Sequence, residues 1–250
     1  MQTKKINLEI CADSVESAMI AQAAGAYRIE FCDNLVEGGT THSLANLISA
    51  REHLQIKLYP IIRPRGGNFL YSDIEFNIMK EDIRKCGEIG CDGVVIGMLN
   101  ADGTIDKERS RELVNVAKEY SMGVTFHRAF DRCNDLPKGL EDIIDIGCER
   151  VLTSGGKNSA LEGIETIRQL VIQAGERIII MPGGGVSPEN IAELVGKTGA
   201  REYHGTFKSR FQCGMLYINR AMTGEEQENT LLWPNPEKIK LAIKTISHLL

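Results

Sequence analysis

The sequence has no long hydrophobic run and no excess of charge of one sign, and each absence excludes a class of protein. No stretch approaches the roughly 20 apolar residues of a membrane-spanning helix, and the N-terminus lacks the apolar segment of a secretory signal. The 29 basic and 34 acidic residues are spread along the chain. This balance leaves no electrostatic footprint for nucleic acid or for a membrane surface. We therefore expect a cytoplasmic protein whose partners are small molecules or other proteins.

The sequence also lacks an even set of cysteines and a dinucleotide-binding fingerprint. Without an export signal, the seven cysteines should be reduced thiols rather than a disulfide framework. No G-x-G-x-x-G follows the first predicted strand, so no nucleotide cofactor is expected. Apolar residues make up 42% of the 250 residues, which is enough for a substantial core.

Short β-branched runs alternate with helical segments along the whole chain. Eight runs are predicted to be strands, at residues 6–11, 27–32, 57–63, 93–97, 123–128, 150–154, 177–182 and 201–205. Strands that alternate with helices form parallel sheets with right-handed crossovers. Eight such units without a break in composition predict an α/β fold, a single (β/α)8 TIM barrel over residues 1–250, with an open doubly wound sheet as the alternative.

One connection is longer than the others, and we expect a loop over about 205–234 before the last helix. Loops of this length are usually lids, partner contacts or mobile surface segments. Trp233 and Pro234 indicate that the far end docks onto the barrel, whereas residues 224–229 read as solvated. A disordered surface loop is an equally good interpretation.

Ionisable side chains occupy inward-facing positions of the first two predicted strands. Alternation places Glu9 and Cys11 on the barrel side of one strand, and Arg28, Glu30 and Cys32 on that side of the next. Ionisable groups inside a barrel are costly unless they are paired, so their presence near the strand ends predicts a site. The alternative is a structural layer of ion pairs. The candidate catalytic residues are Glu9, Glu30, Arg63, His127 and His204.

Glycine-rich turns and arginines predict an anion site at the same end of the barrel. Residues 152–156 (LTSGG) follow the sixth strand, and residues 181–186 (MPGGGV) follow the seventh, just before an expected helix start at Ser187 and Pro188. Arg63 and Arg65 would offer forked donors, unless they pair with the barrel glutamates. The glycines could instead serve only a tight turn. The candidate anion-binding residues are Arg65, Gly155, Gly156, Gly184 and Gly185.

Cys11 and Cys32 occupy matching positions, two residues beyond Glu9 and Glu30. Adjacent strands lie about 4.8 Å apart, so the two sulfurs could share one soft metal ion. Thiolates are the ligands that Cu(I) prefers. Their spacing matches no metal-binding signature, however, and taken alone it favours two buried core cysteines. Among the other polar residues, Asp131 is expected to orient Arg128 or His127.

Several motifs together resemble the CutC copper homeostasis family, from Asn7 to about His204. They are the EIC and RIEFC strand ends, EGGTTHS (37–43), IIRPRGGNFLYS (61–72), DGVVIGML, TFHRAFD, RVLTSGG and IMPGGGV. The resemblance implies a cytoplasmic TIM barrel that self-associates as a dimer or tetramer. It also implies a role in copper handling, with Cu(I) bound through Cys11 and Cys32. His42 stands where the family usually has proline, and is either an added ligand near Cys32 or a surface-loop histidine.

Three functional hypotheses follow. The first is a Cu(I)-binding homeostasis protein in which Glu9 and Glu30 support the two thiolates. The second is an enzyme, an isomerase, lyase or hydrolase, acting on a small anionic and possibly phosphorylated substrate. In that hypothesis Arg63 and the glycine turns hold the anion, while Glu30 or His127 moves a proton. The third is an assembly protein whose barrel serves only as a scaffold.

Overall fold

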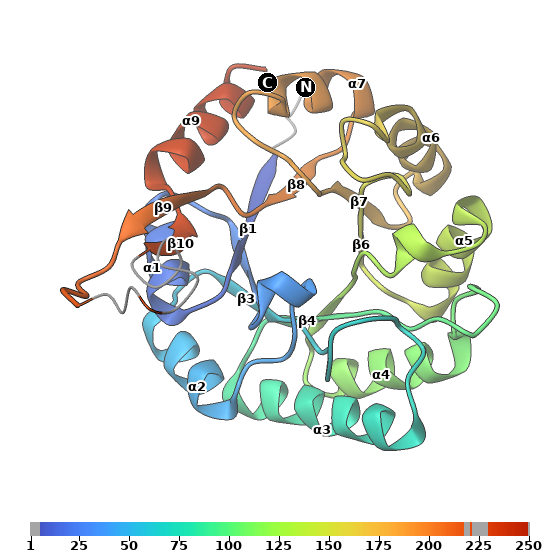
Figure 1. The fold of residues 1–250 in the computed structure, drawn as a ribbon. Helices are drawn as coiled ribbons and strands as arrows, with labels where there is room; N and C mark the ends of the chain where they lie inside the picture. The colour runs from blue at the N-terminus through green and yellow to red at the C-terminus, as the bar shows by residue number, and fades with distance from the viewer. Residues whose placement is uncertain (1–5, 218–220, 222–229, 250) are drawn as a thin grey trace.

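The chain forms a ring of parallel strands enclosed by a ring of helices (Figure 1). The computed structural model describes residues 6–217, 221 and 230–249. Strands β1 to β8 line the inside of the ring, and the helices that connect them cover its outside. This arrangement confirms the (β/α)8 barrel. None of the helices in these residues combines the length and apolar character needed to cross a membrane.

The elements alternate along the chain as expected. The barrel strands are β1 (Asn7–Ala12), β2 (Arg28–Phe31), β3 (Lys57–Pro60), β4 (Gly93–Ile96), β5 (Gly123–Phe126), β6 (Arg150–Thr153), β7 (Ile179–Pro182) and β8 (Glu202–Gly205). The helices are α1 (Val15–Ala23), α2 (Leu44–His53), α3 (Asp73–Ile89), α4 (Lys107–Glu119), α5 (Leu136–Ile146), α6 (Ile164–Ala174), α7 (Ile191–Thr198) and α9 (Pro236–Ser247), with short 3-10 helices η1 (Leu35–Glu37) and η2 (Phe130–Arg132). All eight predicted strands are confirmed, although several are shorter than predicted.

Hydrogen bonding divides the ring into two four-stranded arcs, β3-β2-β1-β8 and β4-β5-β6-β7. The N–H of Ile62 donates to the carbonyl of Val95 at 2.8 Å and joins the β3 end of one arc to β4. Strands β7 and β8 lie side by side at the other junction (Figure 1). Because β1 lies between β2 and β8, Glu9 is in register with both Arg28 and His204. Residues far apart in the sequence therefore meet around β1.

Local sequence explains how the helices begin and end. Ser14 caps α1 by accepting from the N–H of Ser17, and the Ser17 side chain accepts in return from the Ser14 N–H. This capping box satisfies donors that the first helical turn leaves free. Gly147 ends α5 with a φ of 89°, a left-handed conformation that favours glycine. Glycine at such positions allows the chain to turn directly into the next strand.

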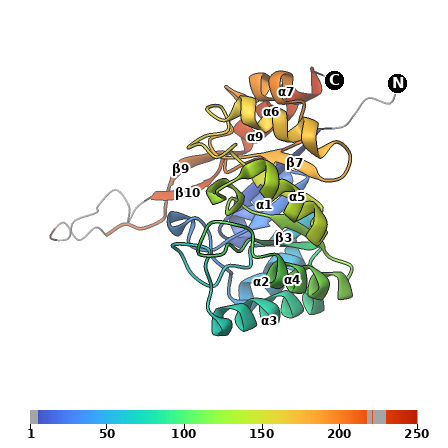
Figure 2. The same cartoon turned by 90° about the vertical axis from the view of Figure 1, so that its right-hand side faces the viewer.

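The expectation of one long loop over 205–234 is wrong for its described part. Strands β9 (Lys208–Gln212) and β10 (Thr230–Pro234) pair antiparallel, outside the barrel and beside α1 (Figures 1 and 2). Half-buried and exposed residues alternate over residues 209–212, a pattern typical of a strand with one exposed face. Trp233 is half-buried and Pro234 is buried, as expected for a docked segment. The solvated segment expected at 224–229 lies outside the described residues.

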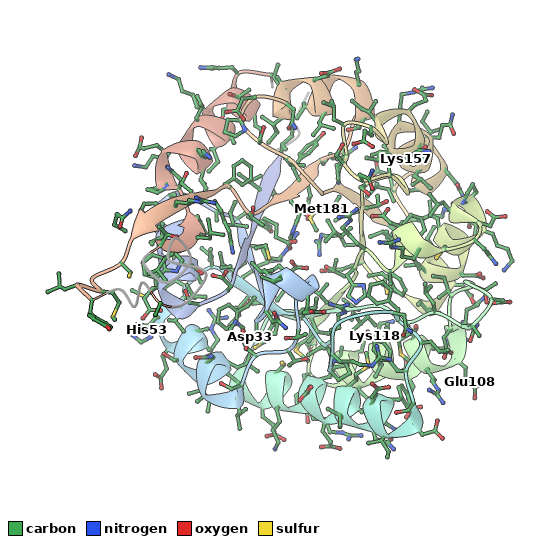
Figure 3. All side chains as sticks on the ribbon, viewed as in Figure 1. Asp33, His53, Glu108, Lys118, Lys157 and Met181 are labelled. Carbon is green, nitrogen blue, oxygen red and sulfur yellow. The ribbon has the colours of Figure 1, made fainter. Side chains whose placement is uncertain are left out.

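A layer of charged side chains fills the barrel interior below the mouth. Arg28 donates to Glu9 and, at 2.5 Å, to Glu202, which also accepts from Arg150 at 2.5 Å. The Arg28 guanidinium reaches the sulfur of Met181 at 3.5 Å, and Figure 3 shows Met181 within the ring of strands. All of these side chains are buried. The alternative of a structural ion-pair layer therefore holds for Glu9 and Arg28.

Replacing Arg28 should strongly destabilise the fold. Arg28→Met leaves two buried carboxylates with fewer partners, and breaking a buried ion pair costs about 3–5 kcal/mol. Equilibrium urea unfolding measures this loss. Arg177→Met is the control, because Arg177 pairs with Glu141 at an exposed position where water screens the pair, so its loss should leave the stability close to that of the wild type. Equal stability of the two variants would contradict a structural role for the buried layer.

Candidate functional site

Two cysteine sulfurs lie together at the C-terminal ends of adjacent strands. Cys11 is near the end of β1, and Cys32 directly follows β2. Their Sγ atoms are 3.3 Å apart, and both side chains are buried. The inward orientation expected for both cysteines is therefore what the structure shows.

A histidine and a carboxylate complete a compact cluster around Cys11. Ligand atoms of Cys11, Glu30 and His204 all lie within 4.8 Å of one another. His204 belongs to β8, and its Nδ1 lies 2.8 Å from a carboxylate oxygen of Glu9. Its Nε2 lies 3.6 Å from Glu30. Four of the predicted site residues thus meet with Cys32, and their donor types suit a transition-metal ion.

The two thiols of the pair have opposite acidity. The hydrogen bond from Cys32 lowers the pKa of Cys11 to about 5, against the effect of burial, and His204 adds to the lowering. The same hydrogen bond, together with burial, raises the pKa of Cys32 well above its usual value. At neutral pH the pair is therefore a Cys11 thiolate that accepts from a Cys32 thiol.

The neighbouring groups balance this buried negative charge. Burial alone would raise the pKa of Glu9, but Arg28 and then His204 hold it at about 2. Burial would lower the pKa of His204, yet Glu30, Cys11 and Glu9 raise it well above its usual value. Burial raises the pKa of Glu30 to about 8. Near neutral pH, the surrounding negative charge therefore keeps His204 cationic.

His127 is a buried and neutral hydrogen-bond donor. Its Nδ1 accepts from the N–H of Ala129 at 3.0 Å, so the proton of the neutral ring lies on Nε2. Nε2 has no hydrogen-bond partner in the part of the chain that the structure describes. Burial, and then the charge of Arg63, lower the pKa of His127 to about 3. His127 therefore stays uncharged, with one free donor.

Two cavities lie near this cluster. The inner cavity, of about 230 Å³, is lined by Cys11, Glu30 and His204 and also by His127 and the turn after β7. The outer cavity, of about 1070 Å³, is lined by residues that include Lys157, which Figure 3 shows on the side of α6. Arg63, Phe69 and Arg128 line both cavities. The two cavities are therefore adjacent.

The two predicted arginines have different places. Arg63 is buried, and its Nη atoms donate to the backbone carbonyls of Glu37, Gly39 and Gly67 at 2.7–2.9 Å. It therefore organises the loops at the mouth, and it does not pair with a barrel glutamate. The structure does not bring Arg65 to the site. Its guanidinium is partly exposed and lines neither cavity, because it pairs at 2.5 Å with Glu75 of α3, on the outside of the barrel.

The glycine turn after β6 already holds an anion of the protein itself. The N–H groups of Ser154 and Gly156 donate to the Asp131 carboxylate at 3.0 Å, while the N–H of Gly155 donates to Thr153 Oγ1 at 2.9 Å. Asp131 also accepts from Arg128 at 2.8 Å, so the expectation that Asp131 orients Arg128 is confirmed. Gly155 and Gly156 therefore have internal partners.

The glycine turn after β7 differs from the turn after β6, because its N–H groups have no internal acceptor in the described chain. Gly184 and Gly185 have φ of +94° and +74°, and both line the inner cavity. Within the described residues, their N–H groups make no hydrogen bond. The predicted helix start at Ser187 and Pro188 is wrong, because α7 begins at Ile191, after Asn190. The turn thus leads into a further short segment before the helix.

Sequence reasoning missed two members of the buried charge layer and misjudged one histidine. Glu202 and Arg150 face inward, as the alternation in REYHG and RVLTS would have indicated. His42 is not a surface histidine: it is buried and stacks on Phe31 with ring centroids 3.9 Å apart. It does not belong to the Cys11 metal-ligand cluster.

The low pKa of Cys11 predicts unusual reactivity in acid. Its alkylation by iodoacetamide should change by less than about twofold between pH 8 and pH 6, because the thiolate persists above its pKa of about 5. Cys133, whose pKa burial raises to about 12, is the internal control and should slow about 100-fold over the same range. Mass spectrometry of the labelled peptides measures both rates. In Cys32→Ala the Cys11 profile should move to higher pH, and an unchanged profile would contradict the hydrogen-bonded pair.

Several known proteins are similar to this chain in sequence and in architecture. The CutC family model matches residues 6–209. A CutC family protein of Xanthomonas campestris pv. campestris (strain 8004) is 52% identical over 201 residues, covering 80% of this chain and 83% of the relative. The mouse copper homeostasis protein cutC homolog is 47% identical over 215 residues, covering 86% and 78% of the two chains. The crystal structure of CutC from Streptococcus agalactiae aligns with a TM-score of 0.76 at 37% identity, over 80% of this chain and 98% of that one. The chain therefore belongs to the CutC family.

Proposed function

We propose that this protein serves copper homeostasis by binding one Cu(I) ion between Cys11 and Cys32. The observation that carries the proposal is the buried sulfur pair, with Sγ atoms 3.3 Å apart and one sulfur held as a thiolate. Soft thiolate ligands select Cu(I) over harder ions. The name of the mouse relative, a copper homeostasis protein, points to the same role.

The donor geometry fits a thiolate-bound ion. Metal–thiolate bonds are about 2.3 Å long, so two sulfurs 3.3 Å apart can share an ion with only a small rearrangement. His204 Nε2 lies in the same cluster, and its Nδ1 is held by Glu9 as the rings of metal-binding histidines usually are. Thiolate and neutral imidazole are the binding forms, so an ion would displace protons from Cys32 and His204.

The thiol state of the protein suits this function. Cys11 and Cys32 are free thiols in the structure, and Cu(I) binding requires that the pair stays reduced. We place this function in the cytoplasm, where free thiols persist.

An anaerobic Cu(I) titration in competition with a chelator tests the proposal. The wild-type protein should bind one tight equivalent, and Cys11→Ser or Cys32→Ser should weaken binding at least about 100-fold because each removes a ligand. Cys133→Ser is the matched control, since Cys133 is half-buried outside the cluster, and it should bind as the wild type does. Wild-type affinity in both cluster variants would refute the proposal.

A histidine variant tests whether the third donor takes part. His204→Ala should weaken Cu(I) binding by about 10- to 100-fold, because it removes the nitrogen nearest the sulfur pair. X-ray absorption at the copper edge should show a nitrogen scatterer in the wild type and its loss in the variant. His53→Ala is the control, because His53 lies in the exposed helix α2. An unchanged spectrum and affinity would restrict the ligands to the two sulfurs.

A further inference from the structure

Part of the inner cavity's lining presents several donors without acceptors. His127 is 4% exposed and lines the cavity, and its protonated Nε2 has no partner among the described residues. Gly184 and Gly185 line the same cavity, and within the described chain their N–H groups are also without partners. Nε2 of His127 is buried, so a ligand that supplies an acceptor there replaces a lost hydrogen bond.

Arg128 brings a positive charge to the same part of the lining. Asp131 accepts from its Nε at 2.8 Å, and Ser154 Oγ accepts from its Nη2 at 2.7 Å. These contacts fix the guanidinium and leave Nη1 for another acceptor. A Cβ placed on Gly184 would lie 3.2 Å from Nη1, so the guanidinium lies directly against the glycine turn. Arginine and backbone N–H groups together are typical ligands for an oxyanion.

The preceding turn of the barrel shows what such a turn binds. The N–H groups of Ser154 and Gly156 converge on the carboxylate of Asp131. The turn after β7 has the same positive-φ glycine pair, at Gly184 and Gly185, yet no carboxylate of the described chain occupies it. One turn is therefore filled by an internal anion, and its neighbour faces the cavity with its donors free.

We propose that the inner cavity binds a small organic anion, with its oxyanion on Arg128 and the Gly184–Gly185 turn and a second oxygen accepting from His127. The ligand class is a small carboxylate or phosphate monoester that carries a further hydroxyl or carbonyl oxygen. The site is independent of the proposed copper ligands, because it uses residues that follow β5 and β7 rather than β1, β2 and β8.

Size and lining support a ligand of this class. The cavity of about 230 Å³ holds roughly seven or eight water volumes, which is the size of a small metabolite. Leu35, Ile61, Phe69 and Leu152 contribute apolar surface that excludes water around the donors. Arg63 adds a buried positive charge to the lining, with Nε unpartnered. The lining therefore combines a positive field with directed donors.

Isothermal titration calorimetry of the full-length, copper-free protein tests the proposal with three probes at low ionic strength. The probes are inorganic phosphate, glycolate and phosphoglycolate, which separate phosphate from carboxylate recognition. The wild type should bind at least one with a Kd of about 1 mM or tighter. Arg128→Gln should weaken binding about tenfold or more. His127→Asn should weaken it to the same degree, because the Asn side chain can keep an acceptor for the Ala129 N–H while the Nε2 donor is lost.

Arg65→Gln is the matched control, because it removes an arginine of a neighbouring loop that lines neither cavity. It should bind the probes as the wild type does. Amide NMR of the wild type provides a readout that needs no variant: phosphate or phosphoglycolate should shift the Gly184 and Gly185 resonances. The proposal is overturned if no probe binds, if Arg65→Gln weakens binding as much as Arg128→Gln, or if the glycine resonances do not move.

Copper measurements separate this proposal from the previous one. Arg128→Gln should retain wild-type Cu(I) affinity, and Cys32→Ser should retain anion binding, since Cys32 does not line the inner cavity. Loss of anion binding in Cys32→Ser but not in Arg128→Gln would overturn the assignment of the anion to the β7 turn.

Discussion

One buried carboxylate, that of Glu9, connects the two polar systems of the barrel. One of its oxygens accepts from Arg28 in the charged layer, and the other lies 2.8 Å from His204 Nδ1 in the cluster at the mouth. Because Arg28 keeps Glu9 ionised, Glu9 can orient the His204 ring and stabilise its positive charge. His204 in turn helps to hold Cys11 as a thiolate. The low pKa of Cys11 at the mouth thus depends on the ion pair between Glu9 and Arg28 in the layer below.

The interior of this barrel is polar where many barrels are filled by branched aliphatic side chains. Charges removed from water are costly, so most of them are paired with one another or with backbone carbonyls, as Arg28, Arg150 and Arg63 are. Of the buried side-chain atoms that lack a partner in the described part of the chain, His127 Nε2 and Arg63 Nε belong to side chains that line the inner cavity, where a ligand would reach them.

The two proposed ligands use different residues around one cavity. The sulfur, carboxylate and imidazole ligands come from β1, β2 and β8, whose parallel pairing brings their ends together. The nitrogen donors follow β5 and β7, in the other arc of the ring. The barrel therefore separates a group of metal ligands from a group of hydrogen-bond donors. This separation allows a metal ion and an organic anion to be recognised by different residues.

Much of this architecture could be predicted because it depends on short-range periodicity. The alternation of strands and helices determined the barrel, and the two-residue period of a strand determined that Glu9, Cys11, Glu30 and His204 face inward. Which of these groups touch was decided only by the closed ring, which places β8 beside β1. The tertiary structure also decided which glycine turn has an internal partner, because Asp131 accepts from the turn after β6 and not from the turn after β7. A sequence pattern reports the face on which a side chain lies, whereas its partner and its charge state depend on the groups that three-dimensional packing brings within a few ångströms.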